Sequence, residues 1–539
     1  MVSVNIASHL PAMAALSPDR PALISNEGTL TFAELNAESD LLAAGLTEIG
    51  ITKGVRTVLM VPPSLSFFPL VFALFKVGAV LVMIDPGIGR GALLSCLNEV
   101  EPEAFIGVPK AHVARLLFRK PFRAVRANVT VGSRWFWGGH TIDDLRRLGQ
   151  GKTFEMREPE ANETAAILFT SGSTGIPKGA VYTHEIFDAQ VRMIKATYGI
   201  EPGEIDLPTF PLFALFDPAM GMTSVLPDMD FRFPAKADPA KLVQAMQEHK
   251  CTTMFGSPAL IDNLSRHCEA QGITLPTLKR VLSAGAPVRN DVLARMAKVL
   301  TGDAQVYTPF GATESLPVAS IGSREVLSDT ASGAAAGLGV CVGKPVPGAT
   351  VRVIRITDAP ITKWSSDLEL PPGEIGEITV RGPMVTAAYY NRPEQTALAK
   401  IADGDQVVHR MGDVGYLDTA GRLWMCGRKS HRVVTTEATL FSVPVEEILN
   451  QHEAVRRTAL VGVGPKGTQK PVVLVEREPS ARAADEELVR ELRALCDKHE
   501  ITKGVRSLRV FPGTFPVDVR HNAKIEREKL ARWAEEQGA

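Results

Sequence analysis

The chain has 539 residues, of which 45% are hydrophobic and 22% charged, and its net charge at pH 7 is −1. Such a length exceeds one typical domain, so two or three domains are expected, with the composition of a soluble globular protein. The near-zero net charge excludes a global attraction to nucleic acid or to an anionic membrane.

Compartment signals are weak but consistent. Six cysteines are scattered without a Cys-x-x-Cys pair, which argues against a disulfide framework or a zinc site and favours a reducing compartment. The N-terminus lacks the basic and apolar blocks of a signal peptide. Pro69, Lys76 and Gly78 interrupt the most lipid-like stretch, 65–84, so it is predicted to be a helix and a buried strand rather than a membrane span. We therefore expect a cytoplasmic protein.

Residues 1–160 alternate between helical and strand patterns. A helix is predicted over 32–49, a strand over 58–61, and a second strand over 79–84 after another helix. This alternation implies parallel strands joined by crossover helices. The run Trp135-Phe136-Trp137 lies between two glycines and is interpreted as a buried corner.

A loop rich in glycine and hydroxyl groups follows a predicted buried strand at 165–169 and precedes a helical pattern. The loop consists of Thr170, Ser171, Gly172, Ser173, Thr174, Gly175, Ile176, Pro177, Lys178 and Gly179. Backbone N–H groups of such turns form an anion-binding concavity, and the lysine adds a point charge. This chemistry suits a polyphosphate, although the loop is neither a Gly-x-x-x-x-Gly-Lys-Ser/Thr motif nor a dinucleotide fingerprint. The alternative is a flexible surface loop.

Further along, strand-like runs at 252–258, 281–287 and 303–314 each end in a turn of small residues. Ligands bind at the carboxyl ends of strands in open parallel sheets, so these ends predict one cleft. Aromatic residues gather at 210–216 and 231–233. They are either a core cluster or the wall of an apolar substrate channel, and both interpretations stay open.

Short strands between turns over 349–428 predict a small antiparallel subdomain. The run Gly427-Arg428-Lys429-Ser430 then marks a boundary, after which a small α/β unit is expected, with Asp485 capping one of its helices. The predicted fold is therefore α/β. A large N-terminal domain, 1–428, contains parallel-sheet α/β subdomains and a small antiparallel β subdomain, and a small α/β C-terminal domain spans 429–539.

Taken in order over nearly the whole chain, these motifs resemble the adenylate-forming superfamily of acyl-CoA synthetases, luciferases and peptide-synthetase adenylation domains. The resemblance implies ATP and Mg²⁺ as cofactors. It assigns the loop at 170–179 to the β- and γ-phosphates and adenine to Gly285, Ala286, Pro287 and Phe310, and it counts Gly311 among the cofactor-binding residues. It further assigns the α-phosphate and Mg²⁺ to Thr313 and Glu314, the ribose to Asp413, the ribose and hinge to Arg428, and catalysis to a mobile C-terminal lysine, Lys524.

The implied reaction starts with a carboxylate that attacks the α-phosphorus of ATP. Mg²⁺ on Glu314 and the ammonium group of Lys524 would neutralise the developing charge, and the product is an acyl-adenylate. In this superfamily the C-terminal domain commonly rotates about its hinge for the second step.

The chain departs from the acyl-CoA ligase pattern at the parts that serve CoA. Ala214 stands where a histidine often gates the CoA tunnel, Ser430 replaces the usual hinge Asp or Lys, the segment 433–439 lacks a glycine, and Ala523 precedes Lys524 in place of glycine. With the run at 516–524, these changes resemble the β-lactone synthetases of bacterial long-chain olefin biosynthesis. That branch implies a long-chain 2-alkyl-3-hydroxy acid whose own β-hydroxyl expels AMP.

Three other functions stay open: a long-chain fatty acyl-CoA or acyl-AMP ligase, a non-catalytic nucleotide-binding homologue, and a module that loads a carrier protein in trans. His184 and His431 are candidates for the base that deprotonates the β-hydroxyl, and each is equally a structural or surface histidine. Expected partners are ATP and the hydroxy acid, and a complex with other olefin-pathway enzymes is left open. No nucleic acid partner and no transmembrane segment are expected.

Overall fold

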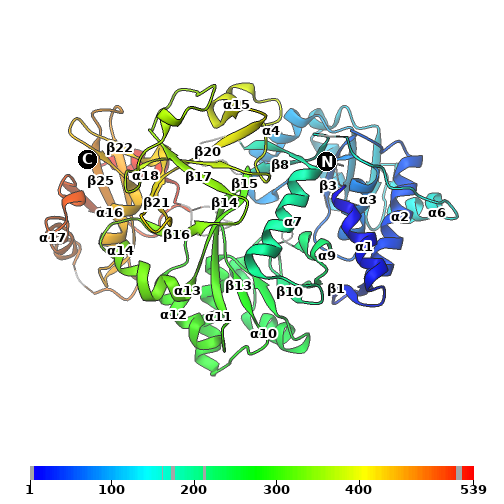
Figure 1. The fold of residues 1–539 in the computed structure, drawn as a ribbon, viewed down its shortest axis with the longest axis horizontal. Helices are drawn as coiled ribbons and strands as arrows, with labels where there is room; N and C mark the ends of the chain where they lie inside the picture. Colours follow the sequence, from blue (N-terminus) through cyan, green and yellow to red (C-terminus); the bar gives the residue numbers. More distant parts are fainter. Residues whose placement is uncertain are drawn as a thin grey trace.

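The computed structural model describes residues 5–160, 162–170, 177–210, 214–482, 484–517 and 525–538. Within these ranges the chain forms a seven-stranded sheet, a fourteen-stranded sheet and, near the C-terminus, sheets of three and two strands. Figure 1 shows the C-terminal sheet at the opposite end of the molecule from the helices of the first 150 residues. The predicted α/β class is confirmed.

The seven-stranded sheet has the order β7-β6-β5-β3-β4-β8-β9, and only its β8–β9 pair is antiparallel. Its strands are β3 Arg56–Met60, β4 Val80–Ile84, β5 Ala104–Gly107, β6 Ala127–Thr130, β7 His140–Thr141, β8 Thr164–Thr170 and β9 Lys178–Thr183. The helices of this part are α1 His9–Leu16, α2 Phe32–Glu48, α3 Phe67–Lys76, α4 Arg90–Val100, α5 Pro109–Leu117 and α6 Ile142–Gly149. The predicted alternation of helices and parallel strands is confirmed here.

Helix α2 shows how local sequence fixes an element. Thr31 and Glu34 form a capping box, in which the Glu34 N–H donates to Thr31 Oγ1 at 3.2 Å and the Thr31 N–H donates to Glu34 Oε2 at 2.8 Å. Leu35, Leu42 and Leu46 lie on one face and are fully buried.

The glycine-rich loop joins two strands, which corrects the prediction that it joins a strand directly to a helix. Strand β9 pairs with β8 from Thr170↔Lys178 onward, and helix α7, His184–Tyr198, begins only after β9. The helical pattern after residue 186 is genuine. The preceding residues instead add an antiparallel edge strand, since pairing with β8 outweighs local propensity.

The fourteen-stranded sheet combines a parallel and an antiparallel region. Its path is β17-β18-β20-β21-β16-β15-β14-β13-β12-β10-β11-β1-β2, with β19 paired to β20. Strands β1 and β10 to β14 pair in parallel, whereas every pair from β14–β15 to β17–β18 is antiparallel. The antiparallel part therefore begins at the β14–β15 hairpin, earlier than the predicted subdomain at 349–428, and shares one continuous sheet with the parallel part.

The strands of this sheet are β1 Pro21–Ser25, β2 Gly28–Thr31, β10 Ile205–Pro208, β11 Thr223–Val225, β12 Thr253–Phe255, β13 Arg280–Leu282, β14 Gln305–Ala312, β15 Ser315–Gly322, β16 Val340–Pro345, β17 Thr350–Ile354, β18 Gly376–Arg381, β19 Lys400–Asp403, β20 Gln406–Leu417 and β21 Leu423–Arg428. The helices among them are α9 Phe216–Met220, α10 Pro239–Glu248, α11 Pro258–Gln271, α12 Asn290–Val299, α13 Ser323–Glu325, α14 Ala331–Ala335 and α15 Pro393–Ala399.

After Arg428 the chain forms a separate three-stranded sheet with its own core. The elements are β22 Val433–Val434, β23 Thr439–Leu440, α16 Ser442–Leu449, β24 Val455–Val463, β25 Lys470–Arg477, α17 Asp485–Cys496, β26 Ser507–Val510 and α18 Arg527–Glu536. The glycine-free segment at 433–439 is the β22–β23 hairpin. Asp485 is the first residue of α17 rather than its cap, and its Oδ1 accepts a hydrogen bond from Arg477 Nη1 at 2.6 Å.

The aromatic run at 135–137 is not a buried corner. Trp135 is 57% exposed and Phe136 is 81% exposed, because the loop between β6 and β7 projects from the edge of the sheet. Among the helices described, none is long and apolar enough to cross a bilayer.

Candidate active site

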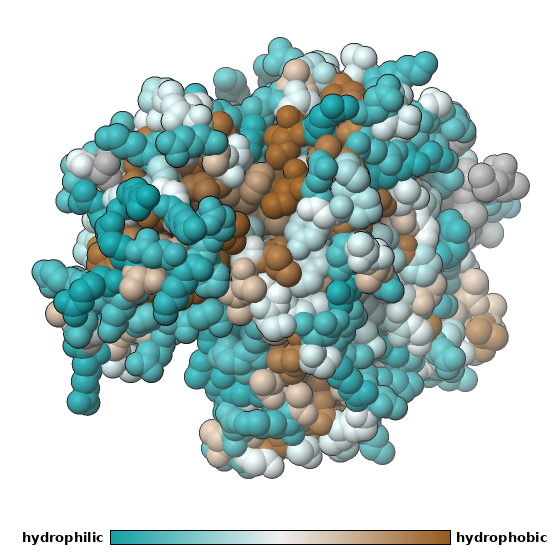
Figure 2. Space-filling model, turned by 60° about the vertical axis from the view of Figure 1, so that its left-hand side comes forward, coloured by the Kyte–Doolittle hydropathy of each residue, from teal (hydrophilic) through white to brown (hydrophobic). Residues whose placement is uncertain are grey.

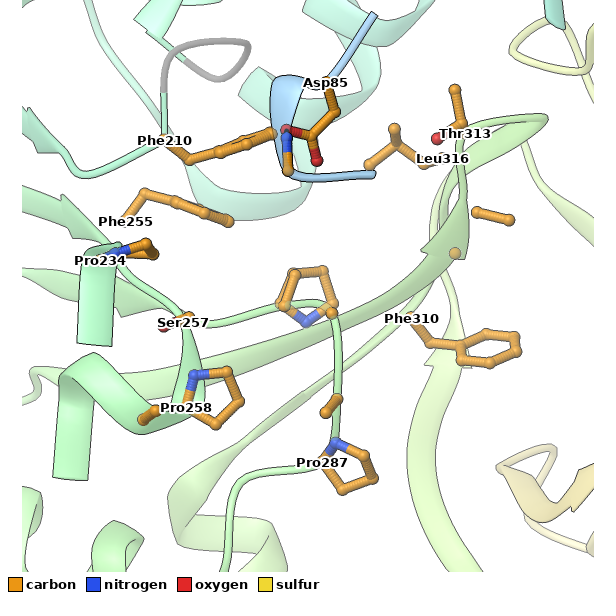
Figure 3. Close-up of a pocket in the computed structure, with 18 of the residues that line it drawn as sticks. Asp85, Phe210, Pro234, Phe255, Ser257, Pro258, Pro287, Phe310, Thr313 and Leu316 are labelled. Carbon is orange, nitrogen blue, oxygen red and sulfur yellow. Dashed lines mark hydrogen bonds between the residues drawn. The ribbon is translucent and has the colours of Figure 1, made fainter. Parts of the chain in front are cut away.

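One cavity of about 3270 Å³ lies where the strand ends of both large sheets meet the C-terminal part. The turns after β12, β13 and β14 all line it, which confirms the single cleft predicted from their sequences. In the close-up of Figure 3, Phe310, Thr313 and Leu316 lie on one side of this space and Phe210, Phe255 and Ser257 on the other. Figure 2 shows apolar side chains along the recess in the middle of the face turned forward.

The predicted adenine residues come together at this cavity. Gly285, with a φ of 97°, follows β13 and leads into Ala286 and Pro287, while Phe310 lies half-buried on the neighbouring β14. Gly311 follows Phe310 near the turn of the β14–β15 hairpin. A Cβ atom at Gly311 would lie 2.9 Å from Leu316 Cβ, so the hairpin closes only around a glycine there.

Glu314 is oriented by a segment distant in sequence. Its carboxylate Oε1 accepts a hydrogen bond from the Tyr389 hydroxyl at 2.6 Å, and its carbonyl accepts from the Thr386 N–H at 3.0 Å. The carbonyl of Thr313 accepts a hydrogen bond from the buried Tyr182 hydroxyl. Burial and the Glu314 charge raise the pKa of Tyr389, so its hydroxyl stays a donor at neutral pH.

Two lysines lie close to the same tyrosine ring. Lys178 Nζ lies 5.0 Å and Lys400 Nζ 5.8 Å from the ring centroid of Tyr389. Lys400 is buried and donates to Thr386 Oγ1 at 3.1 Å. Burial lowers the pKa of Lys400 to about 7, and the nearby Glu314 charge partly opposes that shift.

Sequence reasoning found Lys178 but missed Tyr389 and Lys400. The only local signal for Tyr389 was the Tyr-Tyr-Asn-Arg-Pro-Glu stretch at 389–394, which is typical of a polar turn, and Lys400 lies beyond that stretch. Tyr389 meets Glu314 and forms an isolated bridge with Ala180, and neither contact can be seen in the order of the chain.

Asp413 and Arg428 face each other across neighbouring strands. They are register partners of β20 and β21, and Arg428 Nε lies 3.2 Å from Asp413 Oδ1. Asp413 is buried, and Arg428 also donates to the Met411 carbonyl at 3.3 Å. Both residues line the cavity, so this predicted pair meets at the same site as Glu314.

Several predicted residues lie outside the described ranges: Ser171, Gly172, Ser173, Thr174, Gly175 and Lys524. Thr170 ends strand β8. The chain on either side of both gaps lines the cavity, at Phe169 and Lys178 around the first and at Val517 and Ile525 around the second.

The two candidate histidines have different surroundings. His184 is 1% exposed, its Nδ1 accepts from the Ile6 N–H at 3.4 Å, and burial lowers its pKa to about 4, so it belongs to the core beneath the N-terminal helices. His431 lines the cavity, with Nε2 3.7 Å from Glu528 Oε1. The geometry therefore favours His431 over His184 as a group that could meet a ligand.

The aromatic residues at 210–216 that the structure describes belong both to the hydrophobic core and to the wall of the cavity. Phe210 and Phe216 line the cavity and also pack against the main hydrophobic core. The rings of Phe210 and Phe255 lie 6.4 Å apart along the wall. Such a surface can bind alkyl chains while it stabilises the fold.

The residues present fit a metal ion held together with phosphate rather than by protein alone. No group of three or more His, Cys, Asp or Glu able to hold a metal occurs in the part of the chain that the structure describes. Glu314 supplies a single carboxylate at the cavity, and one of its oxygens is already used by Tyr389. Mg²⁺ is typically bound by one or two carboxylates, waters and substrate phosphates, which matches this donor set.

Comparisons with known proteins show the family of this chain. Residues 10–390 match the family described as AMP-binding enzyme. The chain is 50% identical to an olefin beta-lactone synthetase of Xanthomonas campestris pv. campestris, covering 99% of this chain and 98% of the relative. It is 51% identical to an olefin beta-lactone synthetase of Stenotrophomonas maltophilia, covering 98% of each. A long-chain-fatty-acid–CoA ligase of Salmonella typhimurium is 26% identical over 92% of this chain and 89% of the relative.

Solved structures with similar folds span the whole chain. The amide bond synthetase McbA from Marinactinospora thermotolerans aligns with a TM-score of 0.79 and 24% identity, over 98% of this chain and 99% of that one. The anthranilate CoA ligase AuaEII in complex with anthranoyl-AMP aligns with a TM-score of 0.80 and 19% identity, over 100% and 98%. At these identities the likeness supports the two-part architecture alone.

Proposed function

Because this chain belongs to the AMP-binding enzyme family and shares about half of its residues with two olefin beta-lactone synthetases, we propose a function of the same kind. It is an ATP-dependent ligase that makes a β-lactone. The substrate is a long-chain 2-alkyl-3-hydroxy acid in olefin biosynthesis, and AMP and pyrophosphate are released. The near-complete coverage at 50% identity carries this proposal. The convergence of Glu314, Asp413 and Arg428 on one cavity supports it.

In the first step a carboxylate oxygen forms a bond to the α-phosphorus, and the bond from that phosphorus to pyrophosphate breaks. Asp413 would accept from the ribose hydroxyls while the pair with Arg428 fixes its orientation. Tyr389 holds the Glu314 carboxylate toward the phosphates, and Lys178 adds positive charge beside it. Mg²⁺, when bound with ATP at Glu314, would neutralise phosphate charge.

In the second step the substrate's β-hydroxyl oxygen bonds to the activated carbonyl carbon, the bond to AMP breaks, and the hydroxyl proton leaves. No external nucleophile is needed, since the hydroxyl is part of the acyl group and its proximity replaces CoA. The aromatic wall at Phe210 and Phe216 would hold the two alkyl arms. His431 is the better-placed candidate for the proton acceptor.

We further propose two functional units, 1–428 and 429–539, with the second presenting Lys524 to the α-phosphate. Ion pairs connect the units near the hinge, where Asp358 lies 2.8 Å from Arg432 and Lys429 Nζ lies 2.9 Å from Glu377 Oε1. Association with other enzymes of the same pathway is part of the proposal, and co-purification would test it.

The direct test incubates the protein with ATP, Mg²⁺ and a long 2-alkyl-3-hydroxy acid, with and without CoA. We expect AMP release without CoA and a product with the mass of the dehydrated acid and the raised carbonyl stretching frequency of a four-membered lactone. A thioester that forms only with CoA would instead establish the fatty acyl-CoA ligase function, for which the 26% identical ligase is the precedent. Absence of ATP–pyrophosphate exchange with every acid would identify a non-catalytic homologue.

A further inference from the structure

An exposed aromatic loop, residues 131–139, stands at the edge of the seven-stranded sheet. The rings of Trp135 and Phe136 lie 5.2 Å and 5.6 Å from the ring of Trp137. Trp137 anchors them, since it stacks on His112 of α5 at 5.2 Å with an interplanar angle of 4° and donates to Thr130 Oγ1 at 3.0 Å. The loop thus holds two large apolar rings out in solvent, an arrangement that marks an interaction site.

The stretch of chain that leads into this loop carries more basic than acidic side chains. Residues 104–142 contain no Asp or Glu and seven Lys or Arg: Lys110, Arg115, Arg119, Lys120, Arg123, Arg126 and Arg134. Six of them are exposed, and Arg115 is intermediate. Over the described ranges only Arg123 and Arg134 have acidic partners, Glu101 and Asp144. The segment 104–142 therefore carries a local excess of positive charge on a chain whose net charge is −1.

Helix α5 connects the aromatic and basic features on one face of the sheet. His112 of α5 and Phe122 of the short helix at 120–122 pack edge-on against the same ring, Phe105 of β5, with centroids 5.0 Å and 5.3 Å away. Leu117 ends α5 and is 72% exposed, and the exposed Arg119 and Lys120 follow it. We call loop 131–139, α5 and the segment 118–126 the basic aromatic surface.

The basic aromatic surface borders the cavity of the candidate active site. Lys110 and Ala111, in the first turn of α5, line that cavity together with Met60 of β3. The same turn packs beside the aromatic loop, since a Cβ on Gly132 would lie 3.8 Å from Pro109 Cδ. An acyl chain that leaves the cavity past α5 would therefore emerge next to Trp135 and Phe136.

We propose that the basic aromatic surface binds an anionic lipid bilayer. Trp135 and Phe136 enter the headgroup region, where amphipathic and aromatic rings are favoured, and the Lys and Arg side chains face lipid phosphates. Charge complementarity alone would also suit an acidic protein, but the rings project from a loop rather than line a groove, so they suit a soft surface better than a folded partner. Exchange of acyl chains with the bilayer rests on the proposed function, whereas bilayer binding does not.

Co-sedimentation of the full chain with sucrose-loaded vesicles tests this surface. One set of vesicles contains phosphatidylcholine alone and the other adds phosphatidylglycerol. We expect the wild type to sediment with the anionic vesicles, less so as salt is raised. Trp135→Ser with Phe136→Ser, and separately Arg119→Glu with Lys120→Glu, should each weaken binding about tenfold or more. The matched controls, Leu16→Ser for an exposed apolar residue and Lys498→Glu for an exposed lysine, should bind like the wild type.

Two results would overturn the proposal: a wild type that stays in the supernatant with every vesicle, as a protein-binding surface would, or variants and controls that sediment alike. Thermal unfolding midpoints check that the variants are folded. ATP–pyrophosphate exchange with a water-soluble acid should be unchanged in all variants, because none of the substituted residues lines the cavity. Lipid binding without exchange would leave this proposal standing and count against the proposed function alone.

Discussion

At the scale of single residues, Tyr389 is the group that orients the Glu314 carboxylate. Tyr389→Phe keeps the ring near Lys178 and Lys400 but removes the hydroxyl that donates to Glu314 at 2.6 Å. Loss of a hydrogen bond to a charged group costs about 1.5–3 kcal/mol, so kcat/KM for adenylation should fall roughly tenfold to a hundredfold. The Mg²⁺ concentration for half-maximal rate should rise with it, as measured by ATP–pyrophosphate exchange. A Phe variant with an unchanged magnesium dependence would show that Tyr389 has a packing role only.

Lys524 is predicted to act on the α-phosphate from the C-terminal part. Lys524→Ala should lower adenylation about a hundredfold or more, the typical effect of losing one charge-stabilising donor, while ATP affinity changes little. Pyrophosphate release under single-turnover conditions measures it, with the exposed Lys498→Ala as the matched control. Near-normal release from Lys524→Ala would remove this lysine from the active site.

The buried carboxyls of Asp206 and Asp217 make stability depend on pH. Burial raises the pKa of Asp206 to about 7, and burial plus the charge of Asp206 raises that of Asp217. A carboxyl with a folded-state pKa above its unfolded value adds stability at low pH that is lost as pH rises through the folded pKa. Asp206→Asn should therefore raise the melting temperature, relative to wild type, more at about pH 8 than at about pH 5.

The fully exposed Asp303→Asn provides the control for that experiment. It should shift the melting temperature equally little at both pH values, because an exposed carboxylate keeps its hydration on folding. Equal shifts for Asp206→Asn at the two pH values would mean that these carboxyls do not hold a proton at neutral pH.

At the scale of elements, the β14–β15 hairpin sets the distance between Phe310 and Glu314. Gly311→Ala would force a Cβ to within 2.9 Å of Leu316 Cβ and of the Ser315 carbonyl oxygen. The expected cost is about 1–3 kcal/mol of unfolding free energy, with a larger loss of nucleotide affinity than of fold, measured by chemical denaturation and by ATP binding.

Gly91→Ala offers the opposite expectation. Gly91 lies in α4 with nothing within 4 Å of an added Cβ, so the substitution should stabilise by about 0.5–1 kcal/mol. If Gly311→Ala proved as harmless as Gly91→Ala, the hairpin would be looser than its contacts indicate.

Sequence patterns predicted individual helices and strands better than the way in which these elements connect and pack. The helix after Thr31 and the strand ends near Gly285 and Phe310 followed from local periodicity and turn residues, and the structure confirms them. Strand β9 was missed because its pairing with β8 is a tertiary effect that overrides local preference. The exposure of Trp135 and Phe136 could not be predicted either, because apolar residues are usually buried. The stacking of Trp137 on His112, which holds this loop, is a tertiary contact that the sequence does not show.

At the scale of the whole molecule, one cavity joins the nucleotide residues to the apolar wall, so the chemistry should depend on the acyl group itself. A simple fatty acid that lacks a β-hydroxyl should form its adenylate and stop, which gives a pyrophosphate burst of about one equivalent and little further turnover. A 3-hydroxy acid of equal length should turn over continuously. Sustained turnover of both acids without CoA would contradict ring closure as the release step.

Strand β9 connects the end of the glycine-rich loop to Glu314. The Gly179 carbonyl of β9 accepts a hydrogen bond from the Tyr390 N–H at 2.8 Å. The preceding residue, Tyr389, donates its hydroxyl to the Glu314 carboxylate. The start of β9 and Glu314 of the β14–β15 hairpin are thus connected through the adjacent residues Tyr389 and Tyr390. When the triphosphate is converted to a monophosphate, a displacement of β9 would therefore be transmitted to Glu314. We expect the contacts to the two ends of the nucleotide to be released together.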